Sequence, residues 1–299
     1  MRRIELATSS SFPELTPSDH SLVYPLAKRG FEAHAAPWDD EKVDWGAFNG
    51  VILRSCWNYH KKPGEFRAWI AELQARKIPV WNRPPALLWN MDKIYLKELE
   101  ARGVRIIPTF WISREDLSNS LDQILDDQNW DRAVIKPRIG ASADSVWTTT
   151  RSDAQLDQPR FQKELQHNDL MIQPFLSEIH QGEWSFIFVD GEYSHAILKR
   201  PADGHYFVQT NHGGSWKLRE SADFLVHEAD SIVKTASQCL NLNEPFLYAR
   251  VDGIEVKGKF VLMELELIEP ELFLSELPQA TERMAKAIKL RLELASMNP

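Results

Sequence analysis

The first ninety residues alternate short apolar segments with amphipathic ones, and this alternation restricts the fold more than any other feature of the sequence. Residues 4–7, 33–36 and 50–54 have the composition of short strands, whereas residues 63–77 carry apolar side chains at helical spacing. Strands that alternate with helices usually form a parallel sheet with helices on its faces. We therefore predict an α/β domain over residues 1–90, with ligands bound beyond the carboxyl ends of its strands.

Beyond residue 90 the sequence predicts a mixed α/β (α+β) protein with two further units, residues 91–168 and residues 169–299. One helix is expected over residues 86–102, because Gly103 follows it in the position typical of a helix end. Strands are predicted at residues 132–136, 146–149, 170–173, 182–188, 192–198, 247–254 and 259–266, and helices at residues 117–125, 153–165, 224–240 and 276–295.

Charge and cysteine content exclude several classes of function. The chain carries 35 Lys and Arg against 43 Asp and Glu, a net charge of −8, so no general positive field attracts nucleic acid or an anionic membrane. Cys56 and Cys239 form no C-x-x-C pair and are too few for a disulfide framework, which favours the reducing cytoplasm. No stretch approaches the roughly 20 apolar residues of a membrane helix, and the segment after Arg2 and Arg3 lacks the apolar core of a signal peptide.

Residues 253–260 have the glycine and lysine spacing of a P-loop, but two features argue against that motif. Phe260 replaces the Ser or Thr that would bind Mg²⁺, and Lys257-Gly258 is typical of a hairpin turn between two strands. Any phosphate must therefore be bound by another local site.

Two lysines and a loop of small residues form a candidate phosphate site. Lys93 lies near a predicted helix start, and Lys136 ends a predicted strand just before Gly140-Ala141-Ser142. A lysine at a strand end can pair with nucleotide phosphates while the N–H groups of the loop cover them. Considered singly, each lysine would be an exposed surface charge.

The next predicted strand end offers a site for a nucleotide base. Gln173, Phe175 and Leu176 could form a flat apolar slot whose backbone groups read the edge of adenine, and Glu178 could accept ribose hydroxyls. The alternative is a core strand followed by an exposed glutamate.

Four charged residues lie at alternate positions of the last two predicted strands. Arg250 and Asp252 share one face of the first strand, and Glu264 and Glu266 share one face of the second. Such charges are costly to bury unless they are paired or bind cations. A hairpin would bring the carboxylates together as a site of hard oxygen donors suited to Mg²⁺. The alternative is a strand edge that faces solvent.

A further predicted strand ends in basic residues, and a loop with two glycines follows it. Basic side chains beside a closely approaching backbone can hold a transferring phosphoryl group. His212 in the loop is assigned to binding before proton transfer. The candidates here are Lys199, Arg200, Asn211, His212, Gly213 and Gly214.

The order of these motifs resembles the ATP-grasp superfamily, in particular the branch of prokaryotic glutathione synthetase and RimK-like ligases. The resemblance covers residues 82 to about 275, and residues 1–90 look like the family's N-terminal domain. It implies an ATP-grasp fold in which two subdomains clamp ATP. The matching segments are Asn90-Met91-Asp92-Lys93, Val134-Ile135-Lys136-Pro137, Gly140-Ala141-Ser142, Gln173-Pro174-Phe175-Leu176, Gly182-Glu183-Trp184-Ser185, Lys199-Arg200-Pro201, Asn211-His212-Gly213-Gly214, Arg250-Val251-Asp252 and Glu264-Leu265-Glu266.

The resemblance also implies a role for each candidate residue. The nucleotide would be contacted by Lys93, Lys136, Gly140, Ala141, Ser142, Gln173, Phe175, Leu176, Glu178 and Glu183. The γ-phosphate and the reacting carboxylate would be approached by Lys199, Arg200, Asn211 and Arg250. Two Mg²⁺ ions would be held by Asp252, Glu264 and Glu266, where Glu266 replaces the Asn that the family usually has.

Residues 54–59 and 264–270 also look like a subgroup that contains the cyclo-ligase of D-cycloserine biosynthesis. Such an enzyme activates a carboxylate and lets a nitrogen of the same molecule close the ring. The substrate would be recognised by Arg54, Trp57, Tyr59, His212, Gly213 and Gly214. Trp57 and Tyr59 could instead be core aromatics.

We therefore expect an ATP- and Mg²⁺-dependent ligase that joins a carboxylate to an amine through an acyl phosphate, on small-molecule substrates, as a monomer or homodimer. A small-molecule kinase on the same scaffold is one alternative. A nucleotide-binding regulator without turnover is the other, although three carboxylates and two lysines in compatible places argue against it.

Overall fold

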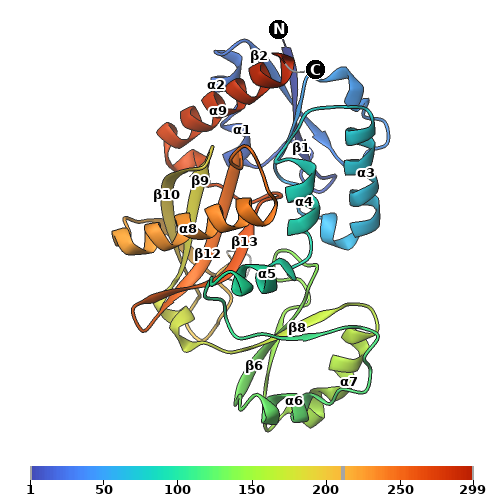
Figure 1. Ribbon diagram of the computed structural model, residues 1–299, viewed down its shortest axis with the longest axis vertical. Coiled ribbons are helices and arrows are strands. Elements are labelled where there is room, and N and C mark those ends of the chain that lie inside the picture. Colours follow the sequence, from blue (N-terminus) through green and yellow to red (C-terminus); the bar gives the residue numbers. More distant parts are fainter. Residues whose placement is uncertain (1, 210–212, 298–299) are drawn as a thin grey trace.

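The computed structural model describes residues 2–209 and 213–297, which form three sheets arranged one after another along the long axis of the molecule (Figure 1). Both described ends of the chain lie at the N-terminal sheet. Within these residues, no helix is long and apolar enough to cross a lipid bilayer.

The N-terminal sheet is fully parallel, as the sequence predicts. Its strands, in the order β2-β1-β3-β4, are β1 (Arg2–Thr8), β2 (Phe31–Pro37), β3 (Val51–Leu53) and β4 (Val80–Trp81). One face packs on α3 (Pro63–Ala75), which buries Phe66, Trp69, Ile70 and Leu73. The other face is covered by the helices α2 (Val23–Ala27) and α9 (Pro278–Met297), so the C-terminal helix returns to the N-terminal sheet (Figure 1).

The single helix predicted over residues 86–102 is wrong, because the structure has two helices there. They are α4 (Pro84–Asn90) and α5 (Tyr95–Ala101). At the break, the Lys93 amide donates to the carbonyl of Arg138 at 3.0 Å instead of continuing the helix. This bond joins the break to the loop that follows β6 (Arg132–Pro137), the strand that carries Lys136, and it places Lys93 next to that loop.

The second sheet is antiparallel and forms the lower lobe in Figure 1. Its strands, in the order β5-β8-β6-β7, are β5 (Phe110–Ile112), β8 (Leu170–Pro174), β6 (Arg132–Pro137) and β7 (Trp147–Thr150). The helices α6 (Leu121–Asp127) and α7 (Ala154–Leu165) cover it. Because β8 pairs with β5 and β6, this unit extends to Pro174, past the predicted boundary at residues 168 and 169.

The third sheet is antiparallel and lies between the other two (Figure 1). Its strands, in the order β11-β10-β9-β12-β13, are β9 (Glu183–Val189), β10 (Glu192–Arg200), β11 (Ser215–Leu218), β12 (Tyr248–Val256) and β13 (Lys259–Glu266). One face packs on α5 and α8 (Asp223–Cys239). The strand β11 is not among the strands predicted from the sequence. The hairpin of β12 and β13 confirms that residues 253–260 are no P-loop.

Short helical turns connect these elements. They are α1 (Pro17–His20), η1 (Trp45–Ala47), η2 (Tyr59–Lys61), η3 (Ser177–Gln181) and η5 (Leu274–Glu276).

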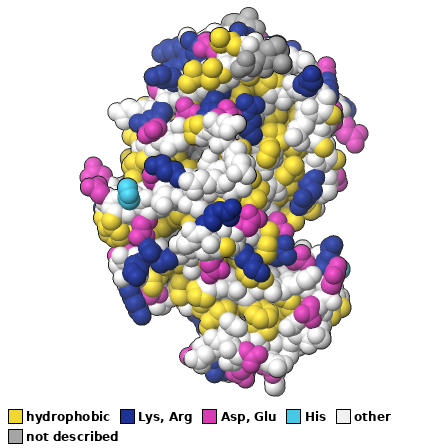
Figure 2. All heavy atoms as spheres, viewed as in Figure 1, with side chains coloured by type: hydrophobic (Ala, Val, Ile, Leu, Met, Phe, Trp, Pro, Cys, Tyr) yellow, Lys and Arg dark blue, Asp and Glu magenta, His cyan; other side chains and the backbone are white. Residues whose placement is uncertain are grey.

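Figure 2 shows lysine and arginine side chains interspersed with aspartate and glutamate on the face viewed in Figure 1. This distribution agrees with the negative net charge and with the expectation that phosphate is bound by a local site.

Candidate active site

A cavity of about 1110 Å³ is lined by residues of all three units. The segments after β1 and β3 form its N-terminal wall, and β12 and β13 contribute Arg250, Asp252, Glu264 and Glu266. Most of the predicted site residues line this one cavity. They are Trp57, Tyr59, Lys93, Lys136, Gly140, Ala141, Ser142, Gln173, Phe175, Leu176, Glu183, Lys199, Arg250, Asp252, Glu264 and Glu266.

The register of β12 and β13 explains why four charges face the cavity. Arg250 pairs with Glu266 and Asp252 pairs with Glu264, whereas the intervening Val251 belongs to the opposite, buried face. A β-bulge follows directly after Asp252.

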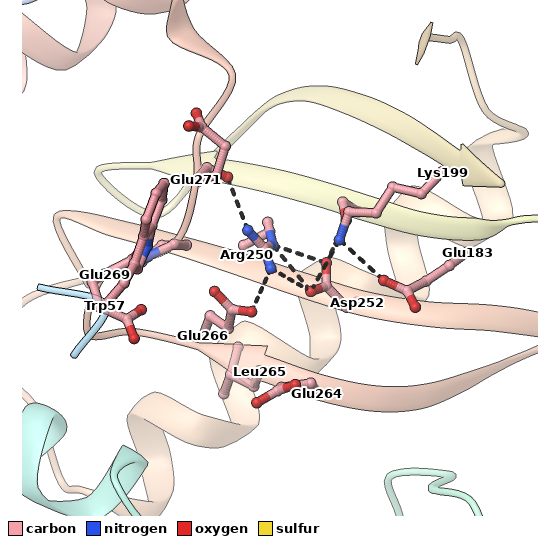
Figure 3. Close-up of polar contacts among 12 residues, drawn as sticks. Trp57, Glu183, Lys199, Arg250, Asp252, Glu264, Leu265, Glu266, Glu269 and Glu271 are labelled. Atoms are coloured by element: carbon pink, nitrogen blue, oxygen red, sulfur yellow. Dashed lines mark hydrogen bonds and ion pairs between the residues drawn. The ribbon is translucent and has the colours of Figure 1, made fainter. Parts of the chain in front are cut away.

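At the centre of the site Arg250 connects three segments of the chain. Its guanidinium donates to Asp252 at 3.0 and 2.8 Å, to the Glu271 carbonyl at 3.1 Å, and to the Glu266 carboxylate. Figure 3 shows the guanidinium between these acceptors. Arg250 is therefore held in a fixed orientation beside the cavity.

Lys199 forms the second part of this network. Its ammonium group lies 3.0 Å from Glu183 and 3.5 Å from Asp252, to which Ser185 also donates a hydrogen bond (Figure 3). Burial opposes ionisation of Asp252, but Arg250 and Lys199 outweigh it and hold the pKa of this carboxyl below its usual range. Burial raises the pKa of Glu183.

Negative charge is in excess along β13 and just after it. Burial, together with Asp252 and Glu264, raises the pKa of Glu266 to about 8, against the opposing effect of Arg250. Burial and Glu264 raise the pKa of Glu269 to about 7. These raised pKa values indicate that a bound cation would stabilise the ionised forms of the two carboxyl groups.

The two lysines of the candidate phosphate site differ in their partners. Lys93 donates to the Gly140 carbonyl at 2.5 Å and lies 3.0 Å from Glu264. Lys136 has no hydrogen-bond or ion-pair partner among the described residues, and burial lowers its pKa to about 8, with Lys93 adding to the effect and Glu264 and Glu183 opposing it. Lys136 is thus a desolvated cation without an anion in direct contact.

The loop that follows β6 closes over this end of the cavity. Ser142, Ala143 and Ser145 have φ of 55°, 59° and 58°, a left-handed conformation that non-glycine residues seldom adopt. Asp144 of this loop lies 3.1 Å from His60 of the N-terminal unit. The loop is therefore tied to both neighbouring units, through His60 and through Lys93.

Several predicted residues do not line the cavity. Arg54 is fully buried, and it donates to Asp19 at 2.7 Å and to the Pro270 carbonyl at 2.6 Å, so the expectation that it contacts substrate is not met. Arg200 is exposed and donates to the Gln181 carbonyl at 3.3 Å. The others outside the lining are Glu178, Gly213 and Gly214, whereas Asn211 and His212 lie outside the described residues.

The two predicted aromatic residues have different surroundings. Tyr59 lines the cavity but is largely buried, with its ring 5.1 Å from that of Phe66, as the core-aromatic alternative expects. Trp57 donates to the Glu269 carbonyl at 2.9 Å, and its ring lies 5.0 Å from that of Phe12. Trp57 therefore both lines the cavity and holds the segment after β13.

His60 and Glu269 are among the titratable residues of the cavity wall that the sequence-based prediction did not include. Glu269 carried a usable signal, because it follows Glu264 and Glu266 in an otherwise apolar segment. His60 carried none, because its contact with Asp144 joins positions 84 residues apart.

The donor chemistry of the site fits magnesium only in part. The described residues contain no group of three or more His, Cys, Asp or Glu side chains that could hold a metal by themselves. Glu264 and Glu266 line the cavity and are paired with Lys93 and Arg250, respectively, while Asp252 is engaged by Arg250 and Lys199. Mg²⁺ commonly binds through one or two carboxylates together with substrate phosphates and water, so these residues fit an ion shared with a nucleotide.

Comparisons with known proteins agree with this geometry. The model of the prokaryotic glutathione synthetase ATP-grasp domain matches residues 92–270, and that of the N-terminal domain of D-cycloserine synthetase DcsG matches residues 4–82. The cycloserine biosynthesis protein DcsG of Streptomyces lavendulae is 29% identical over 273 residues, which cover 88% of this chain and 90% of the relative.

Two solved structures share the arrangement of the whole chain. The crystal structure of D-cycloserine synthetase DcsG has a TM-score of 0.87 at 26% identity, and the match covers 97% of this chain and 99% of the other. D-alanine–D-alanine ligase from Bacillus anthracis, complexed with ATP, has a TM-score of 0.71 at 15% identity and full coverage of both chains, a likeness of fold.

Proposed function

Because the chain belongs to the prokaryotic glutathione synthetase ATP-grasp family, we propose that it uses ATP to activate a carboxylate of a small amino-acid-like substrate as an acyl phosphate, which an amine then attacks. The family resemblance and the ATP-grasp fold expected from the sequence are confirmed. The chain is accordingly an ADP-forming ligase that joins a carboxylate to an amine.

The observation that carries the proposed mechanism is the unpartnered ammonium group of Lys136 beside Lys93 in the cavity. We assign the triphosphate to these lysines and to Gly140, Ala141 and Ser142. A polyanion would satisfy Lys136, and the closely approaching backbone of the loop could cover its oxygens. Adenine would lie against Gln173, Phe175 and Leu176, next to Glu183. Glu178 remains a candidate for ribose.

Magnesium is part of the proposal, with Asp252, Glu264 and Glu266 as ligands and two ions as the expected number. A bound ion would neutralise negative charge on the phosphate groups during phosphoryl transfer. Glu264 and Glu266 support this assignment because they line the cavity, and because the raised pKa of Glu266 shows that its charged form would be favoured by a bound cation. Asp252 would exchange its contact with Lys199 for the ion.

The chain's own residues would orient the reacting groups. Arg250 is held by Asp252, Glu266 and the Glu271 carbonyl, and the one N–H of Nη1 that these contacts leave over would direct the substrate carboxylate toward the phosphate and then stabilise the oxyanion formed when the amine attacks. Lys199 would stabilise charge on the transferred phosphoryl group. Arg200, Asn211, His212, Gly213 and Gly214 remain candidates for closing this end of the site.

We also propose that the attacking amine belongs to the same molecule as the carboxylate, so that the reaction closes a ring. The match of residues 4–82 to the N-terminal domain model of D-cycloserine synthetase supports this, because the wall that this domain contributes would meet the substrate. Two free thiols at Cys56 and Cys239 favour the cytoplasm. A monomer or homodimer is expected.

The test is incubation with ATP, Mg²⁺ and pooled amino acids, followed by mass spectrometry. We expect ADP together with a new amide or lactam. A phosphorylated product without an amide would identify a kinase, and nucleotide binding without ADP would identify a regulator; either result contradicts the proposal. Glu264→Gln serves as the inactive control, because it removes a proposed metal ligand.

A further inference from the structure

The segment after β13 is held in place by its carbonyl groups. Five consecutive carbonyls, from Leu267 to Glu271, each accept a hydrogen bond from a side chain elsewhere in the chain, at 2.6 to 3.1 Å. The donors, in order, are Asn82, Tyr248, Trp57, Arg54 and Arg250. The backbone of this segment is therefore fixed, and so are the side chains that it directs into the cavity.

Glu269 stands out among those side chains. It is 5% exposed and lines the cavity, and within the described part of the chain its carboxylate is bonded by its own backbone amide but has no side-chain hydrogen-bond or ion-pair partner. By contrast, Glu271 accepts a hydrogen bond from the Phe273 amide at 2.6 Å, and Glu266 pairs with Arg250. A buried carboxylate is costly to keep ionised without a cation in contact with it, so a cationic partner is expected to come from a ligand.

The cations near Glu269 are already engaged. Arg250 forms ion pairs with Asp252 and Glu266. Lys93 forms an ion pair with Glu264 and donates a hydrogen bond to the Gly140 carbonyl. Beside Glu269, the apolar ring of Trp57 reduces access of water and strengthens any ion pair that forms there (Figure 3). What fits this place is a positively charged group that can donate hydrogen bonds.

We propose that Glu269 binds the protonated amino group of the substrate, which makes the substrate class an α-amino acid with its ammonium on Glu269 and its carboxylate at Arg250. This inference rests on the proposed function of the same cavity. An ammonium group has no lone pair, so the nitrogen that attacks the acyl phosphate is a different, uncharged one. Glu269 thus determines which end of the substrate reacts.

The test compares ligands that differ only in the amino group. Wild-type protein, Glu269→Gln and the exposed control Glu276→Gln are each loaded with a non-hydrolysable ATP analogue and Mg²⁺. Each is titrated calorimetrically with alanine and serine of both configurations, and with lactate, in which a hydroxyl replaces the amino group of alanine. We expect an amino acid to bind wild type and Glu276→Gln about 10- to 100-fold more tightly than lactate, and Glu269→Gln to lose this preference.

Four results would overturn the inference. Wild type could bind lactate as tightly as alanine, or it could bind no amino acid at all, and neither result depends on a variant. Glu269→Gln could keep the preference. It could also change the Mg²⁺ concentration needed for nucleotide binding, in which case Glu269 is a metal ligand. ADP release with any carboxylate and amine, measured separately on wild type, would still support the ligase, so the two proposals can fail independently.

Discussion

At the scale of single residues, Lys136 and Glu5 are desolvated titratable groups without a hydrogen-bond or ion-pair partner in the described chain, and they have different roles. Lys136 lines the cavity, where an anionic ligand can reach it, whereas Glu5 lies within the N-terminal sheet away from the cavity lining. Replacing Lys136 should therefore change ligand binding, whereas replacing Glu5 should change only the stability of the fold.

Replacing Lys136 by Met should weaken ATP binding by about 10- to 100-fold, because a charge-assisted contact to phosphate is lost. The variant should also be more stable than wild type without ligand at pH 7. The folded pKa of Lys136, about 8, lies below the ordinary 10.5, so the cost of charging it is present below pH 8 and disappears as the pH rises toward 10.5. Calorimetric titration with a non-hydrolysable ATP analogue and thermal melting measure the two effects.

Lys163→Met is the matched control, because Lys163 is exposed on α7 and far from the cavity lining. It should bind the analogue as wild type does. Equal affinity of Lys136→Met and this control would remove Lys136 from the phosphate site.

Glu5 should make stability fall with rising pH. Its carboxyl is fully buried, no described residue bonds to it, and burial raises its pKa to about 8, with Arg3 opposing. The folded state holds this proton more tightly than the unfolded state, so the stability it supports is complete below pH 4.5 and lost as the pH rises through 8. Glu5→Gln, which cannot ionise, should exceed wild type by about 2 kcal/mol at pH 9 and by much less at pH 5.

Melting temperatures at pH 5, 7 and 9 test this, with the exposed Glu41→Gln as the control. A difference between Glu5→Gln and wild type that does not grow with pH would show that Glu5 is already ionised in the folded state.

At the scale of elements, the bulge of the β12–β13 hairpin sets the geometry of the site. It falls between Asp252 and Gly253, and it shifts the pairing from Glu264 directly to Leu262. A Cβ at Gly253 would lie 2.4 Å from the Phe260 ring and 2.5 Å from the Val261 carbonyl. Only glycine therefore fits, and the charged pairs depend on it.

Gly253→Ala should consequently lower stability by about 2–3 kcal/mol and reduce ligase activity more than ATP binding, because it disturbs Asp252 and Glu264. Chemical denaturation and ADP release measure these effects. Gly64→Ala is the control, since Gly64 lies in α3 with open space around it, and alanine there should stabilise the helix by up to about 1 kcal/mol. Equal stability of the two variants would refute the role of the bulge.

The β12–β13 hairpin is the part of the site that the sequence predicted most completely. The alternation of charges on two apolar strands predicted the hairpin and the face shared by Arg250, Asp252, Glu264 and Glu266, because strand periodicity is local. It could not predict the break between α4 and α5, since that break is made by a bond to Arg138, far along the chain. Arg54 was misjudged for the same reason: its partners Asp19 and Pro270 come from distant segments.

At the scale of the whole molecule, the N-terminal sheet is not a separate unit. The helix α9, at the opposite end of the chain, covers one of its faces, and the same core includes Ile187 and Tyr248 of the third sheet. The amphipathic pattern of residues 276–295 predicted this helix but not its partner, because a helix's apolar face carries no information about which sheet it covers. The cavity wall formed by the N-terminal unit thus depends on the C-terminus.

Arg291 of α9 is the polar link in this arrangement, and its loss should destabilise the whole protein. It is 4% exposed and donates to Asp190 at 3.0 Å, to Glu244 at 2.5 Å and to the Pro245 carbonyl at 2.8 Å. Removing one partner of a buried ion pair leaves the other charge uncompensated, so Arg291→Ala should cost about 3 kcal/mol and lower the melting temperature by about 5 °C.

The control is Lys289→Ala on the same helix, where the pair with Glu293 is 3.6 Å long and largely exposed, so little change is expected. Because Asp190 and Glu244 belong to the third sheet's turn and to the segment before β12, Arg291→Ala should loosen the N-terminal sheet against the third sheet. The rate of amide hydrogen exchange should then rise in β1, β3 and α9 together. A rise confined to α9 would show that this helix does not hold the N-terminal sheet against the third sheet.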